Sequence, residues 1–150
     1  MKKRNLKGFT LIELIVVIAI IGVLAAILVP AMMGWVRKAS INSANANAKT
    51  VFTNAQTVAQ EWETRGSGAS VPGSASGGDG TSFSADVQSN LTGDNTAWMV
   101  QINNCVVEAA IAQTSGYVGG YPHAKENTST DKGALDNTNL GYAQNGGWPS

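Results

Sequence analysis

An uninterrupted apolar stretch lies close to the N-terminus of the chain. No charged side chain occurs between Leu14 and Val36, and Arg37 and Lys38 follow at once. A helix needs about 20 apolar residues to cross the hydrocarbon core of a bilayer. The apolar part of a cleaved secretory signal is shorter, about 7–15 residues. The pattern therefore predicts a membrane-spanning helix over residues 9–36.

Beyond this segment, apolar side chains recur at alternating intervals of three and four residues, which places them on one face of a helix. This stripe consists of Ile41, Ala44, Ala48, Val51, Ala55, Val58 and Trp62, and it is widened by Phe52 and Ala59. Because its alanines offer little apolar area, a self-sufficient coiled coil is disfavoured. We predict an amphipathic helix over residues 37–65, ended by Gly66, whose stripe packs against a sheet of the same chain.

The distal part of the chain has a different character. Residues 66–80 are dominated by Gly and Ser and predict a surface loop. Residues 81–150 predict a globular β-rich domain with a short helix or turn near residues 84–91. Within it, two apolar runs flank Asn103 and Asn104, which predicts a β-hairpin with a two-residue turn at these asparagines.

This hairpin predicts a sheet with one face turned toward the helical stripe. In the predicted register Ile102 pairs with Cys105, and Val100 pairs with Val107. The face toward the helix carries Trp98, Val100, Ile102, Cys105, Val107, Ala109 and Ile111, and the opposite face carries Met99, Gln101 and Glu108. After Thr114 the sequence predicts mostly irregular chain with a final strand near residues 140–143. A long N-terminal helix on a small antiparallel sheet is an α+β fold.

Charge and cysteine content narrow the functional classes. The formal net charge is zero, but basic residues are concentrated in the stretch 2–7, which predicts a cytoplasmic N-terminus. From Ala39 onward acidic residues outnumber basic ones, so no nucleic-acid partner is expected. The single cysteine, Cys105, excludes an internal disulfide. Its place on the predicted core face indicates a buried, unreactive thiol.

Few residues offer catalytic or metal-binding chemistry. His123 is the only histidine, and no catalytic arrangement of serine, cysteine and acid stands near it in the sequence. We therefore predict no catalytic residue and no enzyme activity. Asp131 and Asp136 lie among Asn and Thr, but Thr138 and Leu140 occupy positions where further calcium ligands should fall. No metal and no cofactor are expected. The aromatic residues Tyr117, Tyr121, Tyr142 and Trp148 form either an adhesive surface or a small core or subunit contact.

One carboxylate interrupts the apolar pattern at its start. Glu13 stands directly before Leu14, and a charge at bilayer depth costs on the order of 2.5–3.5 kcal/mol, less near the interface. An ordinary signal anchor explains the length and the basic flank of the segment but not this acid. No cation lies within helical reach inside the apolar run, so the carboxylate is expected to need a partner from elsewhere.

The stretch KGFTLIELIVVIAIIGVLAAILVP, residues 7–30, resembles the N-terminal signature of type IV prepilins and of their secretion and competence relatives, the pseudopilins. The resemblance implies that a membrane aspartyl prepilin peptidase cuts between Gly8 and Phe9, which makes residues 1–8 a leader peptide. It also implies N-methylation of Phe9. The new Phe9 amine of one subunit would then supply the partner that Glu13 of another subunit needs.

The resemblance bears on two further features of the chain. Gly22, Pro30 and Gly34 weaken the apolar helix, because glycine costs about 1 kcal/mol and proline about 3 kcal/mol in a helix interior. The family suggests that the helix unwinds or bends there when subunits pack, and a mild kink is the alternative. Many type IV pilins close a C-terminal loop with a cysteine pair, which this sequence lacks. We expect Trp148 to dock the C-terminal region by packing instead.

These features predict a structural subunit. Its precursor would lie in the cytoplasmic membrane, be cleaved and methylated, and polymerise through its apolar helix into a type IV pilus or similar surface filament. The implied partners are other copies of the chain, the prepilin peptidase and methyltransferase, and an assembly ATPase with its platform machinery. A pseudopilin of a type II secretion or DNA-uptake system is the alternative within the family. A membrane-anchored surface binding domain is the alternative of another class.

Overall fold

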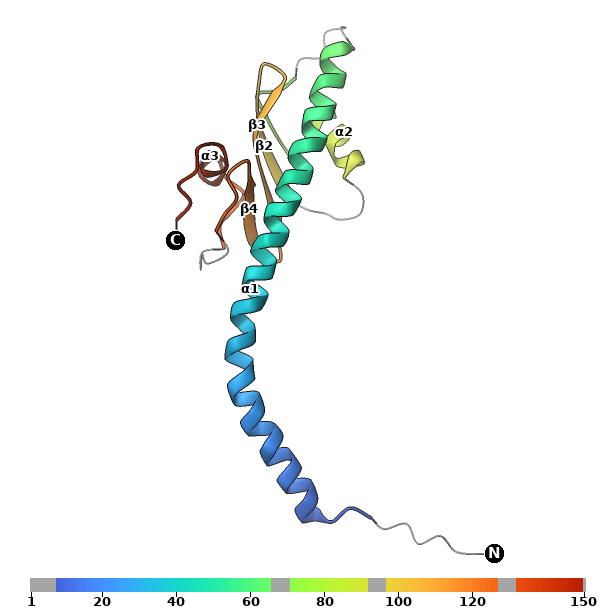
Figure 1. Ribbon diagram of the computed structural model, residues 1–150. Helices are drawn as coiled ribbons and strands as arrows, with labels where there is room; N and C mark the ends of the chain where they lie inside the picture. Colours follow the sequence, from blue (N-terminus) through green and yellow to red (C-terminus); the bar gives the residue numbers. More distant parts are fainter. Residues whose placement is uncertain (1–7, 66–70, 92–96, 127–131, 150) are drawn as a thin grey trace, which may run out of the picture. The chain divides into compact units, whose positions relative to one another are not determined.

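The computed structural model describes residues 8–65, 71–91, 97–126 and 132–149. Its elements are α1 (Leu11–Thr64), β1 (Ser74–Ser76), α2 (Ser82–Asn90), β2 (Ala97–Asn103), β3 (Val106–Thr114), β4 (Tyr117–Tyr121) and α3 (Asn137–Asn145) (Figure 1). The strands form one antiparallel sheet in the order β1-β2-β3-β4. The chain divides into two compact units, Met1–Val36 and Arg37–Ser150, and α1 contributes to both. The predicted α+β fold is confirmed.

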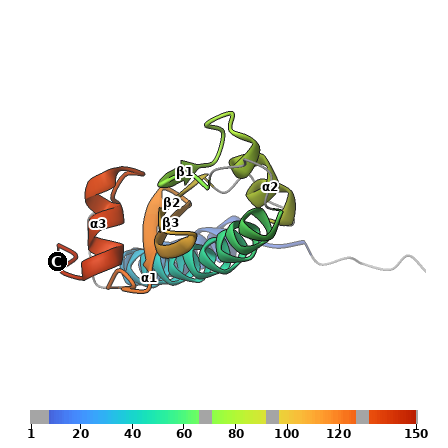
Figure 2. The ribbon, with the colours of Figure 1, turned by 90° about the horizontal axis from the view of Figure 1, so that it is seen from above.

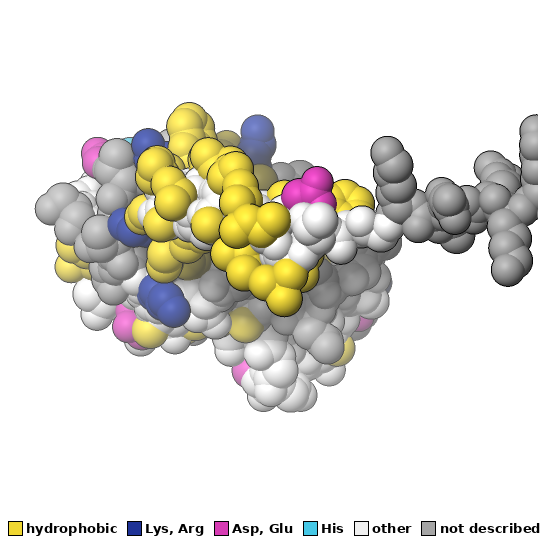
Figure 3. Space-filling model, turned by 90° about the horizontal axis from the view of Figure 1, so that it is seen from below, with side chains coloured by type: hydrophobic (Ala, Val, Ile, Leu, Met, Phe, Trp, Pro, Cys, Tyr) yellow, Lys and Arg dark blue, Asp and Glu magenta, His cyan; other side chains and the backbone are white. Residues whose placement is uncertain are grey.

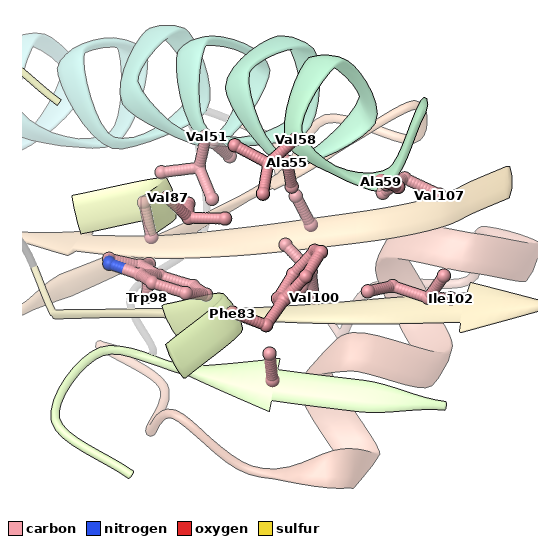
Figure 4. Close-up of a cluster of buried hydrophobic side chains, with 14 residues drawn as sticks. Val51, Ala55, Val58, Ala59, Phe83, Val87, Trp98, Val100, Ile102 and Val107 are labelled. Atoms are coloured by element: carbon pink, nitrogen blue, oxygen red, sulfur yellow. The ribbon is translucent and has the colours of Figure 1, made fainter. Parts of the chain in front are cut away.

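The predicted stripe of α1 lies at the centre of the core of the second unit. Its buried members are Ile41, Ala44, Ala48, Val51, Ala55, Val58 and Ala59, and Phe52 and Trp62 are partly buried against the same cluster. In Figure 4 the side chains of Val51, Ala55 and Val58 point from α1 toward the sheet. The prediction that this stripe packs on a sheet of the same chain is confirmed. Gly66, the predicted end of the helix, lies outside the described residues.

The sheet and α2 supply the other side of this core. Trp98 and Val100 of β2 and Val107 of β3 are almost fully buried in the cluster that contains the stripe. Phe83 and Val87 of α2 complete the cluster (Figure 4). Full burial of one such aliphatic or aromatic side chain contributes about 1.5–3 kcal/mol. The burial of side chains between α1, α2 and the sheet therefore makes the main hydrophobic contribution to the stability of the second unit.

Amide side chains beside the stripe connect α1 to the turns of the sheet. Gln56 accepts a hydrogen bond from the Val107 backbone N–H through Oε1 (2.7 Å) and donates through Nε2 to the Cys105 carbonyl (3.3 Å). Asn47 Nδ2 donates to Thr114 Oγ1 at the far end of β3 (2.8 Å). Backbone groups that leave water need such partners, so these amides fix the position of the hairpin along α1.

The last strand lies directly against the backbone of α1. A Cβ atom at Gly119 of β4 would collide with backbone atoms of Ala44 and Asn45. Asn45 Oδ1 accepts from the backbone N–H groups of Gly120 and Lys125 (both 3.0 Å), and its Nδ2 donates to the Lys125 carbonyl (2.8 Å). The close approach of the β4 and α1 backbones thus requires glycine at position 119. The hydrogen bonds of Asn45 then join the two segments.

The hairpin forms, but its predicted register is wrong. The turn residues are Asn104 and Cys105, both with positive φ (49° and 63°), as the favoured two-residue hairpin turns require. Ile102 accordingly pairs with Val107 rather than with Cys105. The prediction that Cys105 lies on the core face is therefore wrong as well, because the residue occupies the turn and is only partly buried.

A β-bulge also changes which residues of β3 face α1. Gln101 pairs with Ala109 and Ile102 pairs with Val107, so Glu108 is an extra residue in β3. Because side chains alternate along a strand, the extra residue reverses the faces beyond it. The helix α1 then meets Ala110 and Ala112, whereas the predicted core residues Ala109 and Ile111 point to the opposite face.

The opposite face of the sheet is covered by α3, as Figure 2 shows. The second cluster consists of Ala109, Ile111, Val118, Leu140 and Ala143, with Met99, Leu135 and Trp148 partly buried against it. The strand predicted at residues 140–143 is wrong, because these residues belong to a helix whose N-cap, Asp136, accepts from the Asn139 backbone N–H (2.8 Å). The region after Thr114 is also more regular than predicted, since it contains β4 and α3.

The predicted surface loop at residues 66–80 contains strand β1, which pairs with β2. The turn after β1 is organised by Asp79, whose carboxylate accepts from the backbone N–H groups of Ser76 (3.0 Å) and Thr81 (2.9 Å). Burial acts to raise the pKa of Asp79, but hydrogen bonds from Ser84, Ser76 and Thr81 outweigh it and lower the pKa below its ordinary value. Thr81 then caps α2, close to the helix predicted at residues 84–91.

The C-terminal region is docked by Trp148, as predicted. Its indole N–H donates to the His123 carbonyl (2.8 Å), and its ring packs near Tyr142, with 5.7 Å between ring centroids. The ammonium group of Lys125 lies 5.5 Å from the centroid of the Trp148 ring, within the range of a cation–π interaction. Lys125 in turn is held through its backbone by Asn45, so these contacts link the C-terminal segment to α1 without a disulfide.

Val100→Asp should strongly destabilise the second unit. The side chain is fully buried, and an unpaired carboxylate there should cost about 3 kcal/mol or more. Urea unfolding of fragment 37–150, followed by tryptophan fluorescence, measures this cost. Val106→Asp is the matched control, because Val106 lies in the same sheet but is 55% exposed. Equal midpoints for Val100→Asp and the unsubstituted fragment would contradict the packing described above.

Gly119→Ala should also be destabilising, through sterics rather than charge. The added methyl group meets the backbone of α1, and overpacking of this kind costs about 1–3 kcal/mol. Gly141→Ala is the control, since nothing lies within 4 Å of a Cβ there and alanine is favoured over glycine in a helix by about 1 kcal/mol. In the same urea measurement Gly119→Ala should unfold earlier and Gly141→Ala no earlier than the unsubstituted fragment.

Candidate processing and assembly site

The apolar half of α1 has no cover in the structure. The large hydrophobic side chains from Phe9 to Val36 are between 46% and 87% exposed. By length and composition α1 is the one described helix that could cross a membrane, through a window of mean hydropathy 3.2 with no buried residue. Figure 3 shows hydrophobic side chains gathered over this segment. A surface this apolar requires lipid or protein around it.

A capping box begins α1. The Thr10 backbone N–H and hydroxyl both donate to Glu13 Oε2 (2.8 and 2.7 Å), and the Glu13 backbone N–H donates to Thr10 Oγ1 (3.3 Å). The Thr10 carbonyl accepts the first helical hydrogen bond, from Leu14 (3.3 Å). Thr10 is thus the N-cap, and Glu13 is the acid of the third helical position. A carboxylate at this end of a helix also interacts favourably with the positive end of the helix dipole.

This arrangement corrects the expectation that Glu13 lacks a partner within its own chain. Its partner is a polar residue three positions earlier rather than a cation. The signal is visible in the sequence, since Thr-x-x-Glu before an apolar run marks a helix N-terminus. An interpretation of Glu13 only as a charge in a membrane segment misses this capping role.

The two residues of the predicted cleavage site lie outside the helix. Gly8 and Phe9 precede α1 and are exposed, Phe9 by 87%. A Cβ atom at Gly8 would have nothing within 4 Å, so the fold itself does not require glycine at this position. The structure therefore brings Gly8, Phe9, Thr10 and Glu13 together in one short segment, with the Gly8–Phe9 bond open to another molecule.

The predicted weak points of the apolar helix do not interrupt it here. α1 is continuous through Gly22, Pro30 and Gly34. No neighbouring atom lies within 4 Å of a Cβ built at Gly22 or Gly34, so neither glycine is needed for packing within the chain. A role in bending or unwinding during assembly stays a prediction.

The remaining candidates are held in structural contacts. Asp136 caps α3, and Asp131 lies outside the described residues. His123 is exposed and holds the C-terminal segment through its backbone. Tyr121 packs edge-on against Phe52 of α1, with 4.8 Å between ring centroids. Among the described residues no group of three or more His, Cys, Asp or Glu side chains is placed to hold a metal.

Comparison with known proteins identifies the N-terminal segment. Residues 3–29 match the family described as the prokaryotic N-terminal methylation motif. The chain is 49% identical over 51 residues to a fimbrial protein of Moraxella nonliquefaciens, covering 34% of this chain and 33% of that protein. These matches show that the N-terminal part of the chain is similar to that of fimbrial proteins.

Two further relatives show the breadth of this pilin-like similarity. A fimbrial protein of Neisseria meningitidis is 31% identical over 112 residues, which cover 73% of this chain and 57% of that protein. The type II secretion system core protein G of Pseudomonas aeruginosa is 41% identical over 51 residues, 34% of this chain and 36% of that protein. The chain spans only about a third of the first relatives' own length. No solved structure matches it significantly.

Proposed function

We propose that this protein is the structural subunit of a type IV pilus or pilus-like surface filament, stored as a membrane precursor. The observation that carries the proposal is the contrast within α1. Its second half is buried on one side by the sheet, while the first half exposes apolar side chains on every side. Such a segment is stable in lipid and, after extraction, among identical helices.

Processing would prepare this segment for assembly. A prepilin peptidase would hydrolyse the exposed Gly8–Phe9 bond, which leaves a carboxylate on the leader and a new amine on Phe9, and a methyltransferase would methylate that amine. Extraction of the apolar helix from lipid costs about as much as its burial in a filament returns, so an assembly ATPase with platform machinery is an expected partner. None of these steps requires a catalytic residue or cofactor in this chain.

Glu13 would then guide assembly by charge. Inside a filament its carboxylate lies away from water, where loss of a charged partner costs about 3–5 kcal/mol. An incoming subunit avoids that cost when its Phe9 amine meets the Glu13 carboxylate of a neighbour. The pair would set the register of subunits more than it adds net stability.

The second candidate is a pseudopilin of a type II secretion or DNA-uptake system, favoured by the similarity to the secretion core protein. Electron microscopy separates the two, because a pilin forms long surface filaments that contain this protein. A membrane-anchored binding domain is the remaining alternative. Mass spectrometry of the extracted protein tests it, since neither the loss of residues 1–8 nor a gain of one methyl group is expected for such a domain.

Gly8→Val should block processing without disturbing the fold. The open space at Gly8 accepts the side chain, but the peptidase must approach the backbone there, so unmethylated full-length precursor should accumulate in the membrane. Gly22→Val is the control, because Gly22 lies in the apolar half of α1 with equally open space around it, and this variant should be cut normally. Mass spectrometry of membrane fractions measures both, and normal trimming of Gly8→Val would refute the assigned cleavage site.

Glu13→Gln should separate processing from assembly. Glutamine keeps the size of the side chain and an acceptor oxygen for the capping box but removes the charge. The variant should be cut after Gly8 at near-normal levels, remain in the membrane and form no surface filaments when it is the only copy. Glu63→Gln, a neutralised exposed acid near the other end of α1, should assemble. Filament counts by electron microscopy decide, and abundant regular filaments from Glu13→Gln would remove the proposed role of its charge.

A further inference from the structure

The capping box fixes where α1 begins relative to the bond that the proposed function requires to be cut. Thr10 is the N-cap and Leu11 the first helical residue, so Gly8 and Phe9 are the last residues outside the helix. A bond inside a helix has its backbone groups hydrogen-bonded within the chain, and proteolysis follows the population in which the bond is open. The location of the cap therefore determines whether the Gly8–Phe9 bond is open.

We propose that the Thr10–Glu13 capping box positions the Gly8–Phe9 bond for the processing peptidase, by starting the helix at Leu11, three residues after Gly8. Thr10 and Glu13 are positioning residues in this proposal, which rests on the proposed cleavage after Gly8. The cap depends on the Thr10 hydroxyl and on an acceptor oxygen at residue 13. The charge of Glu13 is not needed for it, in contrast to the assembly role.

The physical reason lies in the first backbone N–H groups of α1. A helix leaves these donors without partners, and in the capping box Thr10 Oγ1 accepts from Glu13 while Glu13 Oε2 accepts from Thr10. Without this cap, the N–H groups of Ile12 and Glu13 are satisfied when the helix extends backward, because the carbonyls of Gly8 and Phe9 then accept from them. An N-cap changes such a local equilibrium by roughly 2- to 30-fold, so its loss should slow cleavage by a factor in that range.

Four variants of the full-length precursor separate this role from other roles of the two residues. Thr10→Val removes the hydroxyl at nearly constant shape, and Thr10→Asn supplies a different but equally good N-cap. Glu13→Leu removes the acceptor, and Glu13→Gln keeps it without the charge. Thr53→Val is the matched control, because the Thr53 hydroxyl bonds within α1 to the Lys49 carbonyl (3.0 Å), far from the N-terminus.

Each precursor is incorporated into phospholipid nanodiscs and incubated with purified prepilin peptidase, and cleavage is followed by mass spectrometry. In parallel, the backbone carbon-13 chemical shifts of Gly8 and Phe9 report whether these residues are extended or helical. Thr10→Val and Glu13→Leu should be cut several-fold more slowly, with helical shifts at Phe9. Thr10→Asn, Glu13→Gln and Thr53→Val should be cut at the unsubstituted rate with extended shifts.

The outcomes distinguish this proposal from the proposed function. If the unsubstituted precursor is cut after Gly8 but Thr10→Val is cut equally fast, the capping role is overturned and the processing assignment stands. Failure of Thr10→Asn to restore cleavage also overturns it, because a direct contact between Thr10 and the peptidase then explains the loss. If the unsubstituted precursor is not cut after Gly8 at all, the proposed processing is wrong and this inference falls with it.

Discussion

The burial of one stripe of α1 by the sheet is the contact on which the second unit depends. A small antiparallel sheet needs a covered hydrophobic face to be stable. The stripe and α2 cover that face of β2 and β3. The other connections to α1 run to the same elements. Gln56 and Asn47 hold the two ends of β3, and β4 lies against the helix backbone at Gly119. If the stripe no longer packed on the sheet, these side chains of α1 would lie too far from β3 to form their hydrogen bonds.

A feature of this fold can be predicted from the sequence when the residues that determine it lie close together in the chain. The alternation of three- and four-residue intervals from Ile41 to Trp62 is a property of one helix, so sequence alone identifies every buried member. The hairpin is also local, but its register depends on the Glu108 bulge and on a turn in which Cys105 adopts positive φ. Asparagine is the usual non-glycine residue for that conformation, so the sequence alone favours a turn at Asn103 and Asn104 over the observed turn at Asn104 and Cys105.

The strand β4 could not be predicted because its causes are distant in sequence. Two adjacent glycines usually indicate a turn. Here Gly119 is required by the backbone of α1, and at Gly120 a Cβ would lie 2.8 Å from the Ala143 Cβ of α3. At this point β4 lies so close to both α1 and α3 that only glycine fits at positions 119 and 120. The same distance in sequence explains why residues 140–143 predict a strand although they belong to α3, since the sheet face that α3 covers depends on the bulge in β3.

At the N-terminus, sequence and structure contribute different parts of one site. The motif around Gly8, Phe9 and Glu13 and the Thr-x-x-Glu pattern that begins at Thr10 are both readable from the sequence, whereas the hydrogen bonds between Thr10 and Glu13 come from the structure. The two proposed roles of Glu13 are physically compatible. Both Thr10 groups donate to Oε2, and a carboxylate offers about four lone-pair positions on its two oxygens. The cap can therefore persist while Oε1 accepts from an amine.

Cleavage would create that amine on Phe9, one residue before the cap, where the positive end of the helix dipole disfavours a cation. A carboxylate in the same turn offsets this cost in the monomer, whether the amine belongs to its own chain or to a neighbour. Exchange of one amine for another leaves the number of charged contacts unchanged, and hence adds little net stability. What changes is geometry, because only a neighbour at the correct height along the helix can present its Phe9 to Glu13. A capped helix starts at the same residue in every subunit, so this height is the same in each. The cap and the charge of Glu13 would therefore both act to set the register between subunits.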